Sequence, residues 1–439
     1  MFRQAEAYLT RWLKKKNRSP LLIRGARQVG KSYLIKAFGE KNFKNTVTIN
    51  FEFMPTCIAD FKSLDPVEII NRLQIQTGQK ITPGDTLLFL DEIQDCKEAL
   101  VALRYFKEKM PNLALIAAGS LLEFTLNDTE FRMPVGRVEF LFLNPMSFEE
   151  FLLAKNEDFL LEWIRTIKPG DPIPDSIHQK ALSLVRDYTF TGGMPEAVQY
   201  FIDNPTDVLG VAEVQSKLVQ GYALDFGKYS KTQNQHALLK TIFPKLPYHL
   251  GQQITYSKLE ENVGIREIKA ALELLRLAGL CHFITWTNGE GLPLAANQNP
   301  KKIKLLYLDT GLYLRELRLN STLFAQGDLS LVNKGVLAEQ WVGQQLLGLN
   351  SVSEKPALFF WSNDTRGSQS EIDYLWQKED KIIPIEVKAG NSRQMKSLKI
   401  YLEKFPAPYG IRISHAPLGW ESEKLLSVPY YLIGQLARF

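Results

Sequence analysis

Residues 21–32, which read LLIRGARQVGKS, constrain the fold of this chain more than any other segment. Their glycines, lysine and serine match the pattern G-x-x-x-x-G-K-[ST] at every fixed position. In this pattern, a loop between a strand and a helix turns backbone N–H groups toward phosphate oxygens, and the positive end of the helix faces the same oxygens. Apolar residues precede the loop and residues 33–40 have helical spacing, which is the context that the pattern needs. The sequence therefore predicts an α/β domain with a parallel sheet that binds a nucleoside triphosphate.

The loop assigns roles to individual side chains. Lys31 is expected to reach the β and γ phosphates, and the hydroxyl of Ser32 is expected to bind Mg²⁺. The predicted phosphate-binding residues are Gly25, Ala26, Arg27, Gln28, Val29, Gly30, Lys31 and Ser32. ATP and Mg²⁺ are the cofactors that follow from these assignments.

A second motif lies downstream, where the apolar residues 86–90 end in the carboxylates of Asp91 and Glu92. At the end of a buried strand, Asp91 would hold Mg²⁺ through its water shell and Glu92 would orient and polarise the attacking water. A third predicted strand, 113–118, is followed by Ser120. Two interpretations of Ser120 stay open: it senses the γ-phosphate, or it begins the next turn.

Arg137 also has two interpretations. It follows Gly136 just before a predicted strand, 138–143, and could stabilise negative charge near the γ-phosphate. It could equally be an ordinary surface arginine.

Composition narrows the class of protein. The chain has 439 residues, 45% of them apolar and 23% charged, which is typical of a soluble globular protein of about three domains. Its net charge of +5 permits a nucleic-acid partner without requiring one. The three cysteines are isolated in sequence, which argues against disulfides or structural zinc and predicts a cytoplasmic location. No apolar run is long enough to span a membrane, so no membrane partner is expected.

The middle of the chain is expected to be mostly helical. Residues 151–233 read as helices broken by proline and glycine, which predicts a helical lid. Residues 234–329 then give three short helices followed by a strand and a tight turn, the order of a winged helix. Arg266, Lys269 and Arg276 share much of one face of the third helix. This face either contacts DNA or is simply solvated, and both interpretations stay open.

The last predicted domain spans residues 330–439 and has the element order α-β-β-β-α-β. Glu339 falls on its first helix, Asp373 on its second strand, and Glu386 and Lys388 on its third strand. Glu386 and Lys388 are two residues apart on a strand, so they point the same way. Asp373 and Glu386 would bind Mg²⁺, while Lys388 would position or deprotonate a water that attacks a phosphodiester. The site either cleaves or keeps only the fold, and both interpretations stay open.

These motifs, taken in order, resemble a known group of proteins. The segments 25–32, 87–92, 118–120, 136–137, 144–148 and 191–196 together resemble the AAA-family ATPases of bacteria and archaea that carry an uncharacterised C-terminal domain. The final domain resembles the PD-(D/E)xK nuclease superfamily, although it lacks the proline of the first element, because Asp373 follows Glu371 and Ile372.

The resemblance implies four parts and two candidate functions. The parts are a P-loop AAA-type ATPase domain (1–150), a helical lid (151–233), a winged helix (234–329) and a restriction-endonuclease-like α/β domain (330–439). The first function is ATP hydrolysis coupled to a nuclease-like domain that acts on DNA. The alternative is a nucleotide-dependent signalling switch that binds a protein partner and has an inactive nuclease-like domain. A homo-oligomer is compatible with either function.

Overall fold

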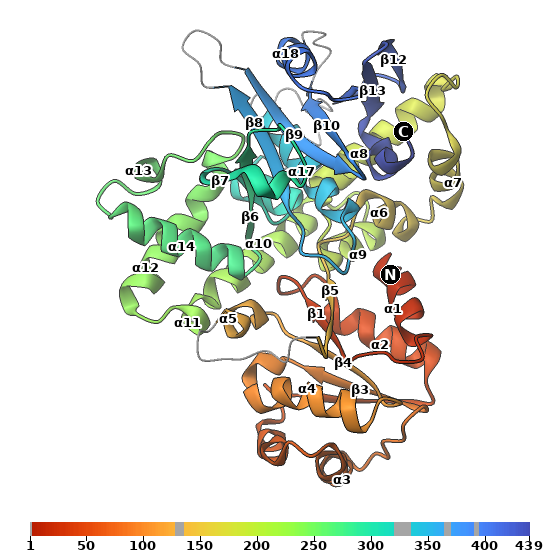
Figure 1. The fold of residues 1–439 in the computed structure, drawn as a ribbon, viewed down its shortest axis with the longest axis vertical. Coiled ribbons are helices and arrows are strands. Elements are labelled where there is room, and N and C mark those ends of the chain that lie inside the picture. The colour runs from red at the N-terminus through yellow and green to blue at the C-terminus, as the bar shows by residue number, and fades with distance from the viewer. Residues whose placement is uncertain (1, 128–135, 320–334, 364–369, 390–394) are drawn as a thin grey trace. The chain divides into compact units, whose positions relative to one another are not determined.

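A computed structural model describes residues 2–127, 136–319, 335–363, 370–389 and 395–439 (Figure 1). Its residue contacts divide the chain into two compact units, which are considered separately. The N-terminal unit comprises residues 1–144 with 277–279 and 351–355. The C-terminal unit comprises residues 145–276, 280–350 and 356–439.

The N-terminal unit contains a five-stranded parallel sheet with the order β2-β3-β4-β1-β5. The strands are β1 (Leu21–Arg24), β2 (Asn45–Asn50), β3 (Thr86–Asp91), β4 (Ala114–Ala118) and β5 (Glu139–Phe142). The helices are α1 (Ala5–Leu13), α2 (Lys31–Asn42), α3 (Pro66–Thr77), α4 (Lys97–Lys109) and α5 (Leu122–Leu126), with 3-10 turns η1 (Pro55–Ser63) and η2 (Ile93–Asp95). The predicted parallel α/β domain is confirmed.

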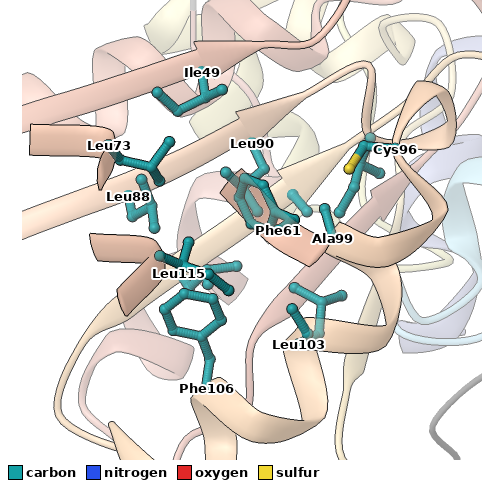
Figure 2. Packing of buried hydrophobic residues seen from close by; sticks show 14 of the residues in the cluster. Ile49, Phe61, Leu73, Leu88, Leu90, Cys96, Ala99, Leu103, Phe106 and Leu115 are labelled. Carbon is teal, nitrogen blue, oxygen red and sulfur yellow. The ribbon is translucent and has the colours of Figure 1, made fainter. Parts of the chain in front are cut away.

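The sheet of this unit is buried on both faces. Every residue of β3 is buried, and its side chains alternate between the two faces. Leu88 and Leu90 join a core with Phe61, Leu103 and Phe106 (Figure 2). This core lies between the sheet and the segments η1, α3 and α4. Burial on both faces explains why the apolar run that ends at Asp91 shows no polar alternation.

The C-terminal unit is rich in helices. Its N-terminal half has α6 (Phe148–Ala154), α7 (Asp158–Thr166), α8 (Asp175–Thr191), α9 (Pro195–Asp203), α10 (Val208–Leu224), α11 (Phe226–Tyr229), α12 (Gln233–Ile242), η3 (Phe243–His249), α13 (Tyr256–Leu259) and α14 (Ile265–Leu277). Its second half has η4 (Leu294–Asn297), α15 (Thr310–Glu316), α17 (Val336–Leu349), α18 (Lys396–Lys404) and η7 (Tyr430–Arg438). A capping box between Ser147 and Glu150 starts α6.

A mixed eight-stranded sheet forms the centre of this unit, with the order β12-β13-β11-β10-β9-β8-β6-β7. Its strands are β6 (Cys281–Thr287), β7 (Gln298–Tyr307), β8 (Leu358–Asn363), β9 (Ser370–Lys378), β10 (Lys381–Val387), β11 (Gly410–Ser414), β12 (Gly419–Ser422) and β13 (Leu425–Pro429). The strand β6, which was expected to belong to a separate winged helix, joins this sheet because it pairs with β7 and, in parallel, with β8. Leu305, Leu306 and Tyr307 are all buried, so the strand β7 is not a free wing.

The described part of the chain contains no helix that is both long enough and apolar enough to cross a membrane.

Candidate functional site

The loop between β1 and α2 is built around Lys31. Gly30 precedes the helix with φ of 95°, a left-handed conformation that favours glycine. The Lys31 side chain is buried, and its Nζ donates hydrogen bonds to the carbonyl oxygens of Gly25 at 2.9 Å and Ala26 at 2.7 Å. Burial lowers the pKa of Lys31 to about 8, although the negative charges of Glu92 and Asp91 oppose that shift. The backbone of the loop thus folds around the ammonium group of Lys31.

The predicted metal-binding groups meet at the carboxyl ends of β2 and β3. The Ser32 hydroxyl donates to Oδ2 of Asp91 at 2.9 Å, and the Asn50 amide donates to the same oxygen at 3.3 Å. Burial raises the pKa of Asp91, and the bond from Ser32 opposes the shift. Hydroxyl and carboxylate oxygens are the donors that Mg²⁺ prefers, so these residues fit that cation.

Glu92 is held by the end of β4, which lies between β1 and β3 in the sheet. The backbone N–H and the hydroxyl of Ser120 both donate to Oε2 of Glu92, each at 3.1 Å. Burial alone would raise the pKa of Glu92, but hydrogen bonds from Gln94 and Ser120 and the charge of Lys31 bring it below its ordinary value. Glu92 is therefore ionised at neutral pH and can accept a proton. Ser120 therefore contacts Glu92, the predicted base.

Arg137 lies elsewhere in the same unit. It precedes β5, and the first residue of β1 pairs with Glu139, so Arg137 is at the amino ends of the strands. Its exposed side chain bonds Oε1 of Glu108, near the end of α4, at 3.1 Å. The P-loop follows the opposite, carboxyl end of β1. Arg137 is therefore not part of its own chain's site, and the predicted role at a γ-phosphate would require the nucleotide of another subunit.

The four predicted residues of the C-terminal domain come together on α17, β9 and β10. Nζ of Lys388 contacts Oε1 of Glu386 at 2.7 Å. Oδ2 of Asp373 accepts a hydrogen bond from the backbone N–H of Val387 at 2.7 Å, which fixes β9 beside the end of β10. Burial raises the pKa of Glu339 to about 8 and the nearby charge of Asp373 adds to this shift. Burial raises the pKa of Glu386 to about 7, again with a contribution from Asp373.

Lys304 is the residue of this cluster that the sequence did not predict. Its side chain on β7 is 2% exposed, and its Nζ contacts Oε1 of Glu371 at 2.5 Å and Oε2 of Glu339 at 3.5 Å. Burial would lower the pKa of Lys304, but the charges of Glu339, Asp373 and Glu371 raise it above its ordinary value. The only signal in the sequence was a lysine inside the otherwise apolar end of β7. Lys304 therefore lies between two carboxylates, with the shorter contact to Glu371 and the longer one to Glu339.

The fit of a metal ion to this cluster depends on Asp373 and Glu386. Oε2 of Glu386 is buried and has no hydrogen-bond partner in the part of the chain that the structure describes. Within the same described ranges, no three His, Cys, Asp or Glu side chains are grouped so as to hold a metal ion. Two carboxylates with an open oxygen are compatible with a divalent cation that completes its shell with water.

The basic face of α14 is smaller than predicted. Arg266 and Lys269 are exposed, and Nζ of Lys269 lies 4.8 Å from the centre of the Tyr256 ring. Arg276 instead forms hydrogen bonds of 2.8 and 2.5 Å with Glu273 of the same helix. Its charge is therefore largely compensated within the helix.

Comparison with protein families identifies the N-terminal domain. Residues 17–152 match the family described as AAA domain. This region is an AAA-family P-loop domain. Two further matches lie outside the AAA domain: residues 182–323 match DUF8612 and residues 334–431 match DUF4143, both described as domains of unknown function.

Solved structures with partial similarity include three proteins of archaea and bacteria. The Walker-type ATPase PABY2304 of Pyrococcus abyssi is 17% identical, with a TM-score of 0.45 over 72% of this chain and 95% of that chain. The Orc1 protein of Aeropyrum pernix in complex with DNA is 13% identical, with a TM-score of 0.30 over 74% and 94%. AMPPCP-bound DnaA of Aquifex aeolicus is 11% identical, with a TM-score of 0.29 over 62% and 87%. These values are too low to assign a function. No curated protein matches the chain.

Proposed function

We propose that the AAA domain binds ATP with Mg²⁺ and hydrolyses it. The observation that carries this proposal is the 2.9 Å hydrogen bond between Ser32 and Asp91, which are 59 residues apart in sequence. It joins the phosphate-binding loop to the acidic strand end, and Glu92 follows directly. Lys31, Ser32, Asp91 and Glu92 thus supply a phosphate-binding cation, two oxygen donors and a base in one place.

Each side chain has a distinct task in this reaction. The ammonium of Lys31 exchanges its carbonyl partners for phosphate oxygens, and Ser32 and Asp91 hold Mg²⁺, which neutralises phosphate charge when bound. A water proton passes to the carboxylate of Glu92 while the water oxygen bonds to the γ-phosphorus. The bond between that phosphorus and the bridging oxygen breaks, which releases ADP and phosphate. Ser120 keeps the carboxylate of Glu92 oriented.

Two substitutions and one control test the ATPase. Lys31→Ala should abolish binding of a fluorescent ATP analogue, whereas Lys36→Ala, an exposed lysine on the same helix, should leave it unchanged. Glu92→Gln should keep nucleotide binding and lower turnover by a factor of about 100 or more, because no base then accepts the proton. Wild-type turnover in Glu92→Gln would disprove the role of Glu92.

A second candidate function is metal-dependent phosphodiester cleavage in the C-terminal domain. The observation in its favour is the buried Oε2 of Glu386 beside Asp373 and Lys388, which has no hydrogen-bond partner among the described residues. Asp373 and Glu386 would hold Mg²⁺, which polarises a phosphoryl oxygen when bound, and Lys388 would orient the attacking water. Glu339 contacts Lys304, so this proposal places Glu339 beside Asp373 and Glu386 and not among the metal ligands.

DNA is the partner that we propose for the whole chain. Support comes from the net charge of +5 and from exposed Arg266 and Lys269 on one helix. If the carboxylates bind no metal, the better proposal is a nucleotide-dependent switch that binds a protein partner through the C-terminal unit. A cytoplasmic location and assembly into a homo-oligomer are compatible with both proposals.

A further inference from the structure

Glu92, the base of the proposed ATPase, accepts a hydrogen bond from a side chain that none of the sequence motifs includes. Nε2 of Gln94, in the 3-10 turn after β3, donates to Oε2 of Glu92 at 2.8 Å. Two bonds from Ser120 reach the same oxygen at 3.1 Å, so three donors converge on Oε2. The backbone of Glu92 has φ of 48°, a strained left-handed conformation for a residue with a side chain. The three hydrogen bonds fix the carboxylate of Glu92.

The position of the Gln94 side chain costs free energy. Its Oε1 is buried and has no hydrogen-bond partner in the described structure, an arrangement that typically costs about 1–3 kcal/mol. This side-chain position also depends on the glycine at residue 119, because a Cβ on Gly119 would collide with Oε1 of Gln94. The orientation of the amide follows from its neighbour: an ionised carboxylate only accepts hydrogen bonds, so the NH₂ group must face Glu92. A costly, sterically specified contact beside a base indicates a role in the reaction.

We propose that Gln94 is the positioning residue of the ATPase, which holds Oε2 of Glu92 so that Oε1 is presented to the attacking water. This inference rests on the proposed role of Glu92 as the base. All three hydrogen bonds go to one oxygen, which leaves the other to take the proton.

Two substitutions remove the contact by different means. Gln94→Met keeps the length of the side chain, deletes the donor and also deletes the unpartnered carbonyl, so we expect no loss of thermal stability. Gly119→Ala leaves Gln94 unchanged and displaces its amide. Gln76→Ala, an exposed glutamine on α3, is the control. The full chain is used throughout, with ATP turnover, affinity for a fluorescent ATP analogue and melting temperature measured for each variant.

Both substitutions should lower kcat by about tenfold or more, a fraction of what a general base contributes, with nucleotide affinity unchanged. A residue that only supports the fold would lower stability and nucleotide affinity as well, so a loss of kcat at unchanged affinity and melting temperature is the deciding result.

Other results would overturn the inference. Unchanged kcat in a stable Gln94→Met protein would show that Gln94 does not position the base. Loss of nucleotide binding or of stability in that variant would instead assign Gln94 a structural role. Glu92→Gln tests the proposed function separately. Normal turnover in that variant would show that Glu92 is not the base, whatever the result for Gln94.

Discussion

At the scale of single residues, Lys304 has the largest predicted effect on stability. Its ammonium is buried between Glu339, whose side chain is 23% exposed, and Glu371, whose side chain is 36% exposed. Lys304→Met keeps the volume but leaves two partly buried carboxylates without their buried cation. Removing one partner of a buried ion pair costs about 3–5 kcal/mol, and the lower end applies because Glu371 is partly solvated. Urea unfolding should show this loss, whereas Lys301→Met, on an exposed lysine of the same strand, should change stability by less than about 0.5 kcal/mol.

The same cluster predicts a pH dependence. Burial raises the pKa of Glu339 to about 8 and that of Glu386 to about 7, above the values of an unfolded chain. Between pH 5 and 8 the folded state therefore binds more protons at these groups than the unfolded state, so the stability that they contribute is lost as pH rises. Tryptophan fluorescence in urea can follow this loss, because the C-terminal unit holds six of the seven tryptophans and Trp12 is the other.

Glu339→Gln provides the matched comparison for that pH dependence. The amide cannot ionise, so the decline in the free energy of unfolding between pH 5 and 8 should become shallower than in the wild type. An equally steep decline would show that Glu339 is not among the groups that titrate in this range.

At the scale of elements, the sequence predicted local structure better than the pairing of distant strands. The helical spacing of residues 33–40 predicted the helix that occurs there as α2 (Lys31–Asn42). The strands β12 and β13 were not predicted, since β12 is short and exposed and gives no apolar pattern. The strand β6 was assigned to a separate winged helix because nothing local shows that it pairs with β8.

This error of pairing explains what was missed in the C-terminal cluster. Asp373, Glu386 and Lys388 lie on neighbouring strands, so alternation along each strand was enough to predict that they converge. Lys304 lies on β7, an edge strand of the sheet. Its contact with Glu339 depends on the long-range pairing of β6 with β8. In the AAA domain, the motif spacing identified Lys31 and Glu92, but it carried no information on Gln94, whose contact depends on an irregular turn.

The helix α14 gives a prediction at this scale. Arg266 and Lys269 are exposed, whereas Arg276 is bonded to Glu273, so only the first two are expected to contact phosphates. The Arg266→Ala, Lys269→Ala double variant should bind duplex DNA more weakly and lower the slope of log affinity against log salt by about two units. Arg276→Ala should leave that slope unchanged. Equal slopes in all three proteins would mean that α14 does not contact DNA.

At the scale of the whole molecule, the two compact units predict that the two proposed chemistries are separable. The P-loop and Glu92 belong to the N-terminal unit, while Asp373 and Glu386 belong to the C-terminal unit, and each unit has its own sheet. Asp373→Asn should therefore leave ATP turnover within about twofold of the wild type, because substitutions at independent sites act separately. It should also abolish binding of Mn²⁺ to the C-terminal unit and any Mn²⁺-dependent cleavage of DNA.

The matched control for this last prediction is Asp380→Asn, which removes an exposed carboxylate from the turn between β9 and β10 and should change neither activity. Isothermal titration with Mn²⁺ in the Lys31→Ala background separates metal binding in the C-terminal unit from nucleotide-linked metal. Equal Mn²⁺ binding by the wild-type and Asp373→Asn forms would exclude Asp373 as a ligand. If the wild type itself binds no Mn²⁺ there, Lys304 and Lys388 are the resident cations of the cluster, and the nucleotide-dependent switch with a protein partner becomes the better account of the C-terminal unit.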